Sequence, residues 1–135
     1  MKVLLDTNVL LDVALARPQF VVASARAVSK ARSAPHLAAI CAASVTTLHY
    51  LLRQSMPDAR VRQTIGDFLA AMELASVNHA VVHAALGSAM RDFEDAVLAH
   101  AAAQAGVDAI VTRNTKDFVK SPVRAITPEQ WLATP

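Results

Sequence analysis

Short apolar runs alternate with longer periodic stretches along this chain, and no other feature limits its possible folds as strongly. Runs such as KVLL at residues 2–5 and DAIV at residues 108–111 are typical of short buried strands. Strands that alternate with helices form βαβ units, so we predict an α/β fold with a mostly parallel sheet. The predicted strands cover residues 2–5, 36–43, 75–77, 108–111 and 123–126.

The stretches between these strands carry helical signals. Apolar residues recur at every third position from Val22 to Ala31, which predicts an amphipathic helix over residues 19–32. Further helices are predicted over residues 9–16, 44–54, 59–75, 80–90 and 92–105, with a final turn over residues 128–131. The chain has no GxGxxG or GxxxxGK[ST] loop, so neither a dinucleotide site nor a P-loop nucleotide site is expected.

Length and composition indicate one globular domain that spans residues 1–135. The chain is 54% hydrophobic and 18% charged with a formal net charge of +2, which is unlike the composition of a disordered chain. Its apolar runs are shorter than the ~18 residues of a membrane-spanning helix, and no secretory signal opens it, so we expect no membrane association. A single cysteine cannot form an internal disulfide, so we expect a cytoplasmic protein.

Acidic residues that are far apart in the sequence fall at one predicted edge of the sheet. Asp6 follows the first predicted strand, and Asp117 comes shortly after the strand that ends at Val111. Glu94 and Asp95 occupy the first turn of a helix that begins at this edge, because crossover helices run antiparallel to the strands. Ligands of such sheets bind outside the carboxyl ends of the strands, so we expect these four carboxylates to form a shared site.

Four carboxylates in one place repel each other strongly. The repulsion is roughly 4 kcal/mol for a pair ~4 Å apart at an effective dielectric constant near 20. Protons or a bound cation relieve it. Oxygen ligands without Cys or His partners suit Mg²⁺ or Mn²⁺ better than zinc, so the sequence predicts a site for one of these two ions.

Each acid also has a purely structural interpretation. Asp6 can cap the helix that follows it, and the acids near residue 94 can offset the positive end of their helix dipole. Asp117 can be a solvated loop residue. We assign a capping role to Asp92 and a structural or peripheral role to Asp12, whereas the coincidence of the other four acids at one edge favours a shared site.

Three sequence segments together carry a family resemblance. They are LLDTNVLLD at residues 4–12, DFEDAVLAHAAAQAG at residues 92–106 and AIVTRNTKDF at residues 109–118. In this order they resemble the PIN domain (PilT N-terminus) family, metal-dependent ribonucleases that include the VapC-type toxins, and in particular a subgroup that lacks one usual acid. The resemblance covers almost the whole chain and implies a three-layer α/β sandwich with a short, mostly parallel central sheet, similar to a Rossmann fold.

The resemblance also implies roles for individual residues. Asp6, Asp95 and Asp117 match the acids that hold the catalytic Mg²⁺ or Mn²⁺. Thr112 matches a threonine that supports the same loop. Asn114 stands where many members have an acid, and we expect it to orient a water molecule or a carboxylate.

One departure from the family pattern affects the expected site. Many PIN domains have a glutamate five residues after the serine that Ser44 matches, and this chain has His49 there. We therefore predict that Glu94 faces the acidic cluster, replaces the missing charge and acts as a further catalytic acid. His49 is then a supporting residue of the site, a contact to substrate or Tyr50, or a buried structural histidine.

The function that the resemblance implies is hydrolysis of RNA phosphodiester bonds by the toxin of a toxin–antitoxin pair. Expected partners are RNA, a cognate antitoxin protein and a second copy of the chain in a homodimer. Arg113, Lys116 and Arg17 are candidates for contacts to RNA phosphates, with a solvated surface position as the alternative. The changes at His49 and Asn114 keep open a catalytically weakened PIN-like module that binds RNA or protein. A phosphorelay receiver needs paired acids after its first strand, and only Asp6 is found there.

Overall fold

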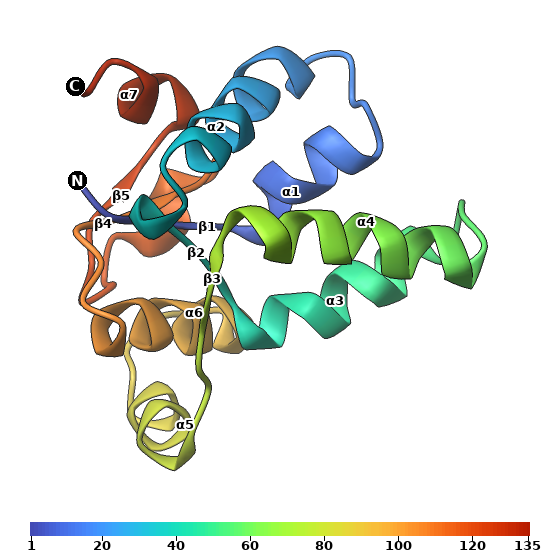
Figure 1. The fold of residues 1–135 in the computed structure, drawn as a ribbon. Helices are drawn as coiled ribbons and strands as arrows, with labels where there is room; N and C mark the ends of the chain where they lie inside the picture. Colours follow the sequence, from blue (N-terminus) through green and yellow to red (C-terminus); the bar gives the residue numbers. More distant parts are fainter.

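Five short strands form one sheet in the order β3-β2-β1-β4-β5, and all four pairings between neighbouring strands are parallel (Figure 1). The structure is a computed structural model that describes residues 1–135 except for the side chain of Pro35. The strands are β1 (Val3–Leu5), β2 (Ala38–Cys41), β3 (Glu73–Ala75), β4 (Ala109–Val111) and β5 (Ala125–Ile126). The predicted α/β fold with a parallel sheet is therefore confirmed.

Helices cover both faces of this sheet and make the fold a three-layer sandwich (Figure 1). On one face, α1, α2, α3, α4 and α7 contribute to the larger apolar core, which includes Trp131 of α7. On the other face, α5 and α6 pack around a second core. The helices are α1 (Thr7–Ala14), α2 (Val21–Ser33), α3 (Ala42–Leu52), α4 (Asp58–Ala71), α5 (His79–Leu86), α6 (Phe93–Gln104) and α7 (Pro128–Leu132), with 3-10 turns at Pro35–Leu37 and Thr115–Phe118.

The apolar sequence of the central strand β1 follows from its position between two layers of helices. Val3 and Leu5 point into the core beside α1 and α2, whereas Leu4 points into the core beside α6. Successive side chains of a strand alternate between faces, and all three residues are fully buried because helices cover both faces. A strand buried on both sides needs a continuous apolar run, which is what the sequence shows.

The strand register aligns the carboxyl ends of three strands. Leu5, the last residue of β1, pairs with Ile40 of β2 on one side and with Val111 of β4 on the other. The backbone N–H of Asp6 then donates to the carbonyl of Val111 at 2.9 Å. Residues that directly follow β1, β2 and β4 consequently meet at one edge of the sheet.

The main difference from the predicted elements concerns the end of α4. The sequence predicts a helix over residues 59–75 and a strand over residues 75–77, but the helix ends at Ala71 and the strand covers Glu73–Ala75. These three residues pair with Ala39–Cys41 of β2. Pairing with a distant strand therefore overrides the local helical pattern.

Smaller differences concern helix ends. The helix predicted over residues 80–90 ends at Leu86, and α3 begins at Ala42 instead of residue 44. The start of α6 is as predicted, because Asp92 accepts from the backbone N–H of Asp95 at 2.9 Å and so caps the helix. Gly106 follows α6 with a φ angle of 71°, the left-handed conformation that glycine adopts at helix C-termini.

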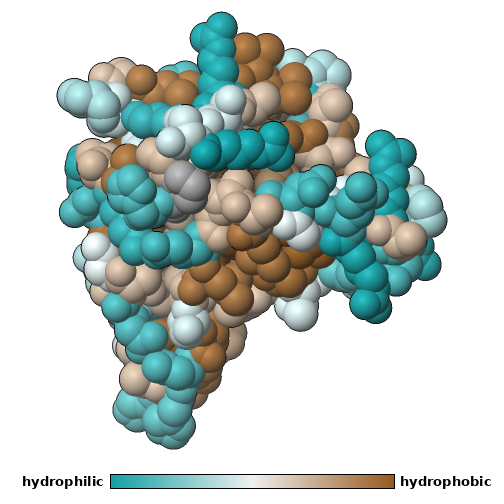
Figure 2. All heavy atoms as spheres, in the orientation of Figure 1, coloured by the Kyte–Doolittle hydropathy of each residue, from teal (hydrophilic) through white to brown (hydrophobic). Residues whose placement is uncertain are grey.

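The surface carries no continuous apolar band on the face that Figure 2 shows, where hydrophobic side chains form separate patches between hydrophilic ones. Leu86 and Tyr50 are among the large hydrophobic residues that are exposed. No helix among the described residues has the length and apolar character needed to cross a membrane.

Candidate functional site

A pocket at the carboxyl ends of β1, β2 and β4 is lined by acidic side chains from three parts of the chain. Asp6 comes from the residue after β1, and Asp117 from the 3-10 turn after β4. Asp92, Glu94 and Asp95 come from the start of α6. The structure thus brings together all four acids that the sequence places at this edge, and we call this space the acidic pocket.

Asp6 is held at the pocket by two hydrogen bonds. The backbone N–H of Thr7 donates to its Oδ1 at 2.7 Å, and the hydroxyl of Thr112 donates to its Oδ2 at 2.8 Å. The side chain therefore caps α1 and lines the pocket at the same time. Burial raises the pKa of Asp6, the two hydrogen bonds oppose this rise, and the charges of Glu94 and Asp117 add to it.

Thr112 connects the acid to the loop after β4. Its hydroxyl donates to Asp6 and accepts from the side-chain amide of Asn8 at 3.2 Å and from the backbone N–H of Asn114 at 3.1 Å. A hydroxyl has one donor and two acceptor positions, so its hydrogen-bonding capacity is used completely. Thr112 is fully buried, and its position beside Asp6 follows from the pairing of β1 with β4.

Asp95 is an acid of the pocket whose pKa is strongly raised. Its side chain is half-buried, and this burial is the largest cause that raises its pKa to about 7. The charges of Asp6, Asp92, Asp117 and Glu94 raise it further, in that order. The residues around the pocket therefore do not fully compensate its negative charge.

Glu94 is held in the acidic pocket by a residue of α3. The hydroxyl of Thr47 donates to its Oε1 at 3.0 Å. Helix α3 presents Ser44, Thr47 and Leu51 to the pocket, at helical spacings of three and four residues. Glu94 lies where the sequence places it, although its role as a replacement charge is a separate proposal.

His49 is not brought to the acidic pocket. Its Nε2 lies 2.7 Å from Oδ1 of Asp58, and the Nε of Arg62 donates to the other oxygen of that carboxylate at 2.7 Å. Five helical residues turn by about 500°, so a residue five positions after Ser44 points roughly 140° away from it. The hydrogen bond from His49, followed by that from Arg62, lowers the pKa of Asp58.

Arg113 and Arg17 contact Asp12, although the sequence made both of them candidates for phosphate contacts. The Nε of Arg113 donates to Asp12 Oδ2 at 2.7 Å, and an Nη of Arg17 lies 3.5 Å from Oδ1. The hydroxyl of Ser24 donates to Oδ2 at 3.0 Å, and the guanidinium of Arg113 stacks 3.9 Å above the ring of Phe20. Asp12 is completely buried in this network, which confirms its structural role.

Three polar residues of the pocket, Thr7, Asn8 and Thr47, were not singled out from the sequence. Thr7 and Asn8 follow Asp6 in the first motif, and this position was the available signal. Thr47 had no signal beyond its helical spacing from Ser44, which the sequence identified only as the serine of the family pattern. The hydroxyl of Thr7 donates to that of Ser44 at 3.0 Å and so connects α1 to α3 across the pocket.

The residues of the acidic pocket fit a hard divalent cation by their chemistry. Its described polar lining offers carboxylate, hydroxyl and amide oxygens but no Lys or Arg, and Asp6 and Asp95 have raised pKa values. In the described part of the chain, no three His, Cys, Asp or Glu side chains already surround one point. The carboxylates would therefore have to move closer together around an ion.

The raised pKa of Asp95 predicts how the stability of the metal-free protein depends on pH. Because the folded pKa of about 7 exceeds the ordinary aspartate pKa of 3.8, folding favours protonated Asp95 and stability falls as pH rises between these values. We expect Asp95→Asn to raise stability near pH 8 by about 1 kcal/mol after screening, or ~4 °C in Tm.

Thermal unfolding in chelator near pH 4 and pH 8 measures this effect, with Asp67→Asn on the exposed side of α4 as the matched control. The Asp95→Asn variant should gain stability over the wild type at the higher pH and little at the lower pH. An equal change in Tm at both values would contradict the assigned cause.

Comparison with known proteins adds a family match. Residues 2–116 match the model of the family described as PIN domain. No curated protein matches the chain. The family match covers the first two sequence segments completely and the third, at residues 109–118, up to residue 116.

Several solved structures share the fold. The DNA-bound VapBC of Salmonella typhimurium aligns with a TM-score of 0.71 at 18% identity, over 95% of this chain and 98% of that chain. FitAcB from Neisseria gonorrhoeae gives 0.70 at 19% identity, over 94% and 98%. VapC20 of Mycobacterium tuberculosis, described as a Sarcin-Ricin loop cleaving toxin, gives 0.66 at 13% identity, over 81% and 87%. At such identities the similarity is one of fold.

Proposed function

The chain belongs to the PIN domain family, and from this premise we propose that it is a divalent-metal-dependent ribonuclease that hydrolyses RNA phosphodiester bonds. The observation that carries the proposal is the acidic pocket at the carboxyl edge of the sheet, where Asp95 has a pKa of about 7. A cluster of carboxylates with uncompensated charge favours a cation, and phosphate is a natural further ligand of that cation.

Asp6, Asp95 and Asp117 are the residues that we propose to hold Mg²⁺ or Mn²⁺. When bound, the ion would supply the Lewis acidity that activates water and offsets charge on the phosphate. Thr112 keeps the carboxylate of Asp6 oriented, and Asn114 can orient a water molecule or a carboxylate at the pocket. Glu94 adds a fourth charge from the first turn of α6.

The biological role that we propose is that of the toxin in a toxin–antitoxin pair. Similar folds include the toxin-antitoxin complex from Klebsiella pneumoniae, and VapC20 is described as a Sarcin-Ricin loop cleaving toxin. These relatives support an antitoxin protein as partner and RNA as substrate. We also propose that the protein forms a homodimer and that it acts in the cytoplasm.

Removal of the metal tests the proposed activity. Metal is first removed from the protein with a chelator and dialysis. We expect this metal-free protein to leave a mixed-sequence single-stranded RNA intact. We expect it to cleave the same RNA when Mn²⁺ or Mg²⁺ is added. Denaturing electrophoresis of end-labelled RNA measures the products. Equal cleavage with and without chelator would contradict a metal-dependent enzyme.

A second candidate is a PIN-like module that binds RNA or protein without cleaving it. The observation in its favour concerns α3. This helix presents Ser44 and Thr47 to the pocket, but it presents no acidic residue there. RNA binding without cleavage at any Mn²⁺ or Mg²⁺ concentration would favour this candidate over the enzyme.

A further inference from the structure

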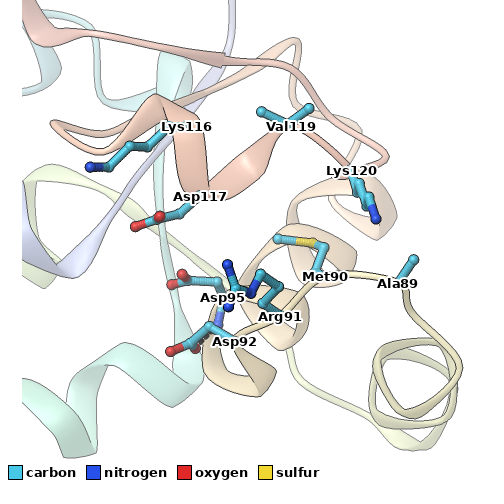
Figure 3. Close-up of a pocket in the computed structure, with 9 residues that line it drawn as sticks. All are labelled: Ala89, Met90, Arg91, Asp92, Asp95, Lys116, Asp117, Val119 and Lys120. Atoms are coloured by element: carbon cyan, nitrogen blue, oxygen red, sulfur yellow. Dashed lines mark hydrogen bonds between the residues drawn. The ribbon is translucent and has the colours of Figure 1, made fainter.

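A second pocket adjoins the acidic pocket and has a different character. Its volume is about 580 Å³, and it shares Asp92, Asp95 and Asp117 with the acidic pocket. Its remaining lining residues are Ala89, Met90, Arg91, Lys116, Val119 and Lys120 (Figure 3). We call it the flanking pocket.

Among the described residues, cationic side chains line the flanking pocket but not the acidic pocket. The flanking pocket has three cationic residues in its lining, Arg91, Lys116 and Lys120, whereas the described lining of the acidic pocket has none. Among the ion pairs of the described residues, none involves these three side chains. Their charge is therefore available to a ligand, unlike that of Arg113, which pairs with Asp12.

The carboxylates and Lys120 lie on opposite sides of the flanking pocket. In Figure 3 the carboxylates of Asp95 and Asp117 point to one side, and Lys120 lies on the opposite side with Met90 between them. A negatively charged chain that runs in this direction from the carboxylates, where an ion would offset their charge, reaches Lys120, whereas Lys116 points to the side of the carboxylates and Arg91 lies beside Asp95.

The wall of the flanking pocket combines apolar and cationic surface. Val119 is 81% exposed, whereas Met90 lies largely buried between the carboxylates and Lys120 (Figure 3). Nucleic acids alternate negative phosphates with apolar sugar edges and base faces, so such a wall can contact both parts. The volume of about 580 Å³ falls in the range of roughly 300–1,000 Å³ that is typical of small-ligand sites.

We propose that the flanking pocket binds the nucleotide on one side of the scissile phosphate in a single-stranded segment of RNA. Arg91 and Lys120 each contact a phosphate of this segment, and Met90 and Val119 contact the sugar and base of the nucleotide. Bases are accessible to such a wall only when they are unpaired. This inference rests on the proposed function because it takes RNA as the substrate of the adjoining acidic pocket.

RNA binding in the absence of metal tests the inference separately from catalysis. The probe is a fluorescein-labelled, mixed-sequence single-stranded RNA of about 12 nucleotides, titrated in chelator at several salt concentrations. The test variant is Arg91→Ala/Lys120→Ala. The matched control is Arg26→Ala/Arg60→Ala, which removes the same charge from exposed positions on α2 and α4.

We expect the test variant to raise Kd about 10-fold near 0.1 M salt and to lower the salt slope by about 1.4, because two phosphate contacts to a single strand are lost. The control variant should change Kd less than about 2-fold. Equal effects of the two double variants on Kd would overturn the inference. It would also be overturned if the test variant lost as much affinity for a fully paired RNA hairpin as for the single strand.

Three further outcomes separate this inference from the proposed function and from a protein partner. Loss of RNA binding in the test variant, with no cleavage by the wild type in Mn²⁺, would support the flanking pocket and contradict the nuclease. Normal cleavage by the test variant at RNA concentrations below KM would overturn the inference alone. Loss of affinity for poly-glutamate but not for RNA would assign the pocket to an acidic peptide and overturn it as well.

Discussion

The Asp6→Asn variant is expected to lose metal-dependent RNA cleavage by at least about 100-fold. Loss of partners that only orient metal ligands typically weakens sites ~10- to 100-fold, and Asp6 is proposed as a ligand itself. Asparagine keeps the size of the side chain and one oxygen that accepts from the backbone N–H of Thr7, and it loses the acceptor of the Thr112 hydroxyl. The fold should therefore survive while one charge of the acidic pocket is lost.

Cleavage rates over a range of Mn²⁺ concentrations, together with calorimetric titration of Mn²⁺, measure this effect. Asp67→Asn is the control for removal of a surface charge. The Glu94→Gln variant should bind Mn²⁺ more weakly and recover cleavage at high Mn²⁺ if Glu94 supplies only the additional charge. Retention of wild-type cleavage by Asp6→Asn, with an unchanged Tm, would contradict the proposed site.

The Asp12→Ala variant is expected to lower the free energy of unfolding by about 3 kcal/mol, near the lower end of the range for a broken buried ion pair. Asp12 is fully buried and accepts from Arg113, Arg17 and Ser24. Its removal leaves these donors without their acceptor. The lower end of the range applies because the side chains of Arg113 and Arg17 are 21% and 39% exposed and reach water.

Urea unfolding measured by circular dichroism gives this free energy. Asp67→Ala should change it by less than about 0.5 kcal/mol, as expected for a surface position. The Asp12→Asn variant should fall between the wild type and Asp12→Ala, because an amide oxygen still accepts from Ser24 without the charge. A change below about 1 kcal/mol in Asp12→Ala would contradict a role of this network in stability.

The network around Asp12 also supports the loop of the candidate site. Arg113 lies directly between Thr112, which binds Asp6, and Asn114, which lines the acidic pocket. The ion pair with Asp12 therefore fastens this loop to α1. The sequence suggested an RNA contact for Arg113, because sequence alone cannot show that a distant carboxylate already occupies a guanidinium.

The positions of Asp6, Glu94, Asp95 and Asp117 at one edge followed from the sequence because topology decides them. A residue that directly follows a strand of a parallel sheet lies at its carboxyl edge, and crossover helices begin there. Short buried strands and a helix capped by Asp92 were likewise readable from local patterns. Such features depend on the chain near each residue and on general rules of βαβ connection.

Other features depend on contacts between residues far apart in the sequence. Glu73–Ala75 forms a strand because it pairs with β2, although the adjoining sequence continues a helical pattern. The side chain of His49 points to Asp58 because of its angular position on α3. The flanking pocket exists because the loop before α6 and the turn after β4 face each other.

The alternation of apolar runs and helices by itself determined the α/β class, the parallel sheet and the edge at which the acids meet. Tertiary structure alone decided which cations stay available, because Asp12 neutralises Arg113 and no described ion pair involves Lys120. The physical reason is range: backbone periodicity is encoded within a few residues, whereas burial and ion pairing arise only when distant segments pack together.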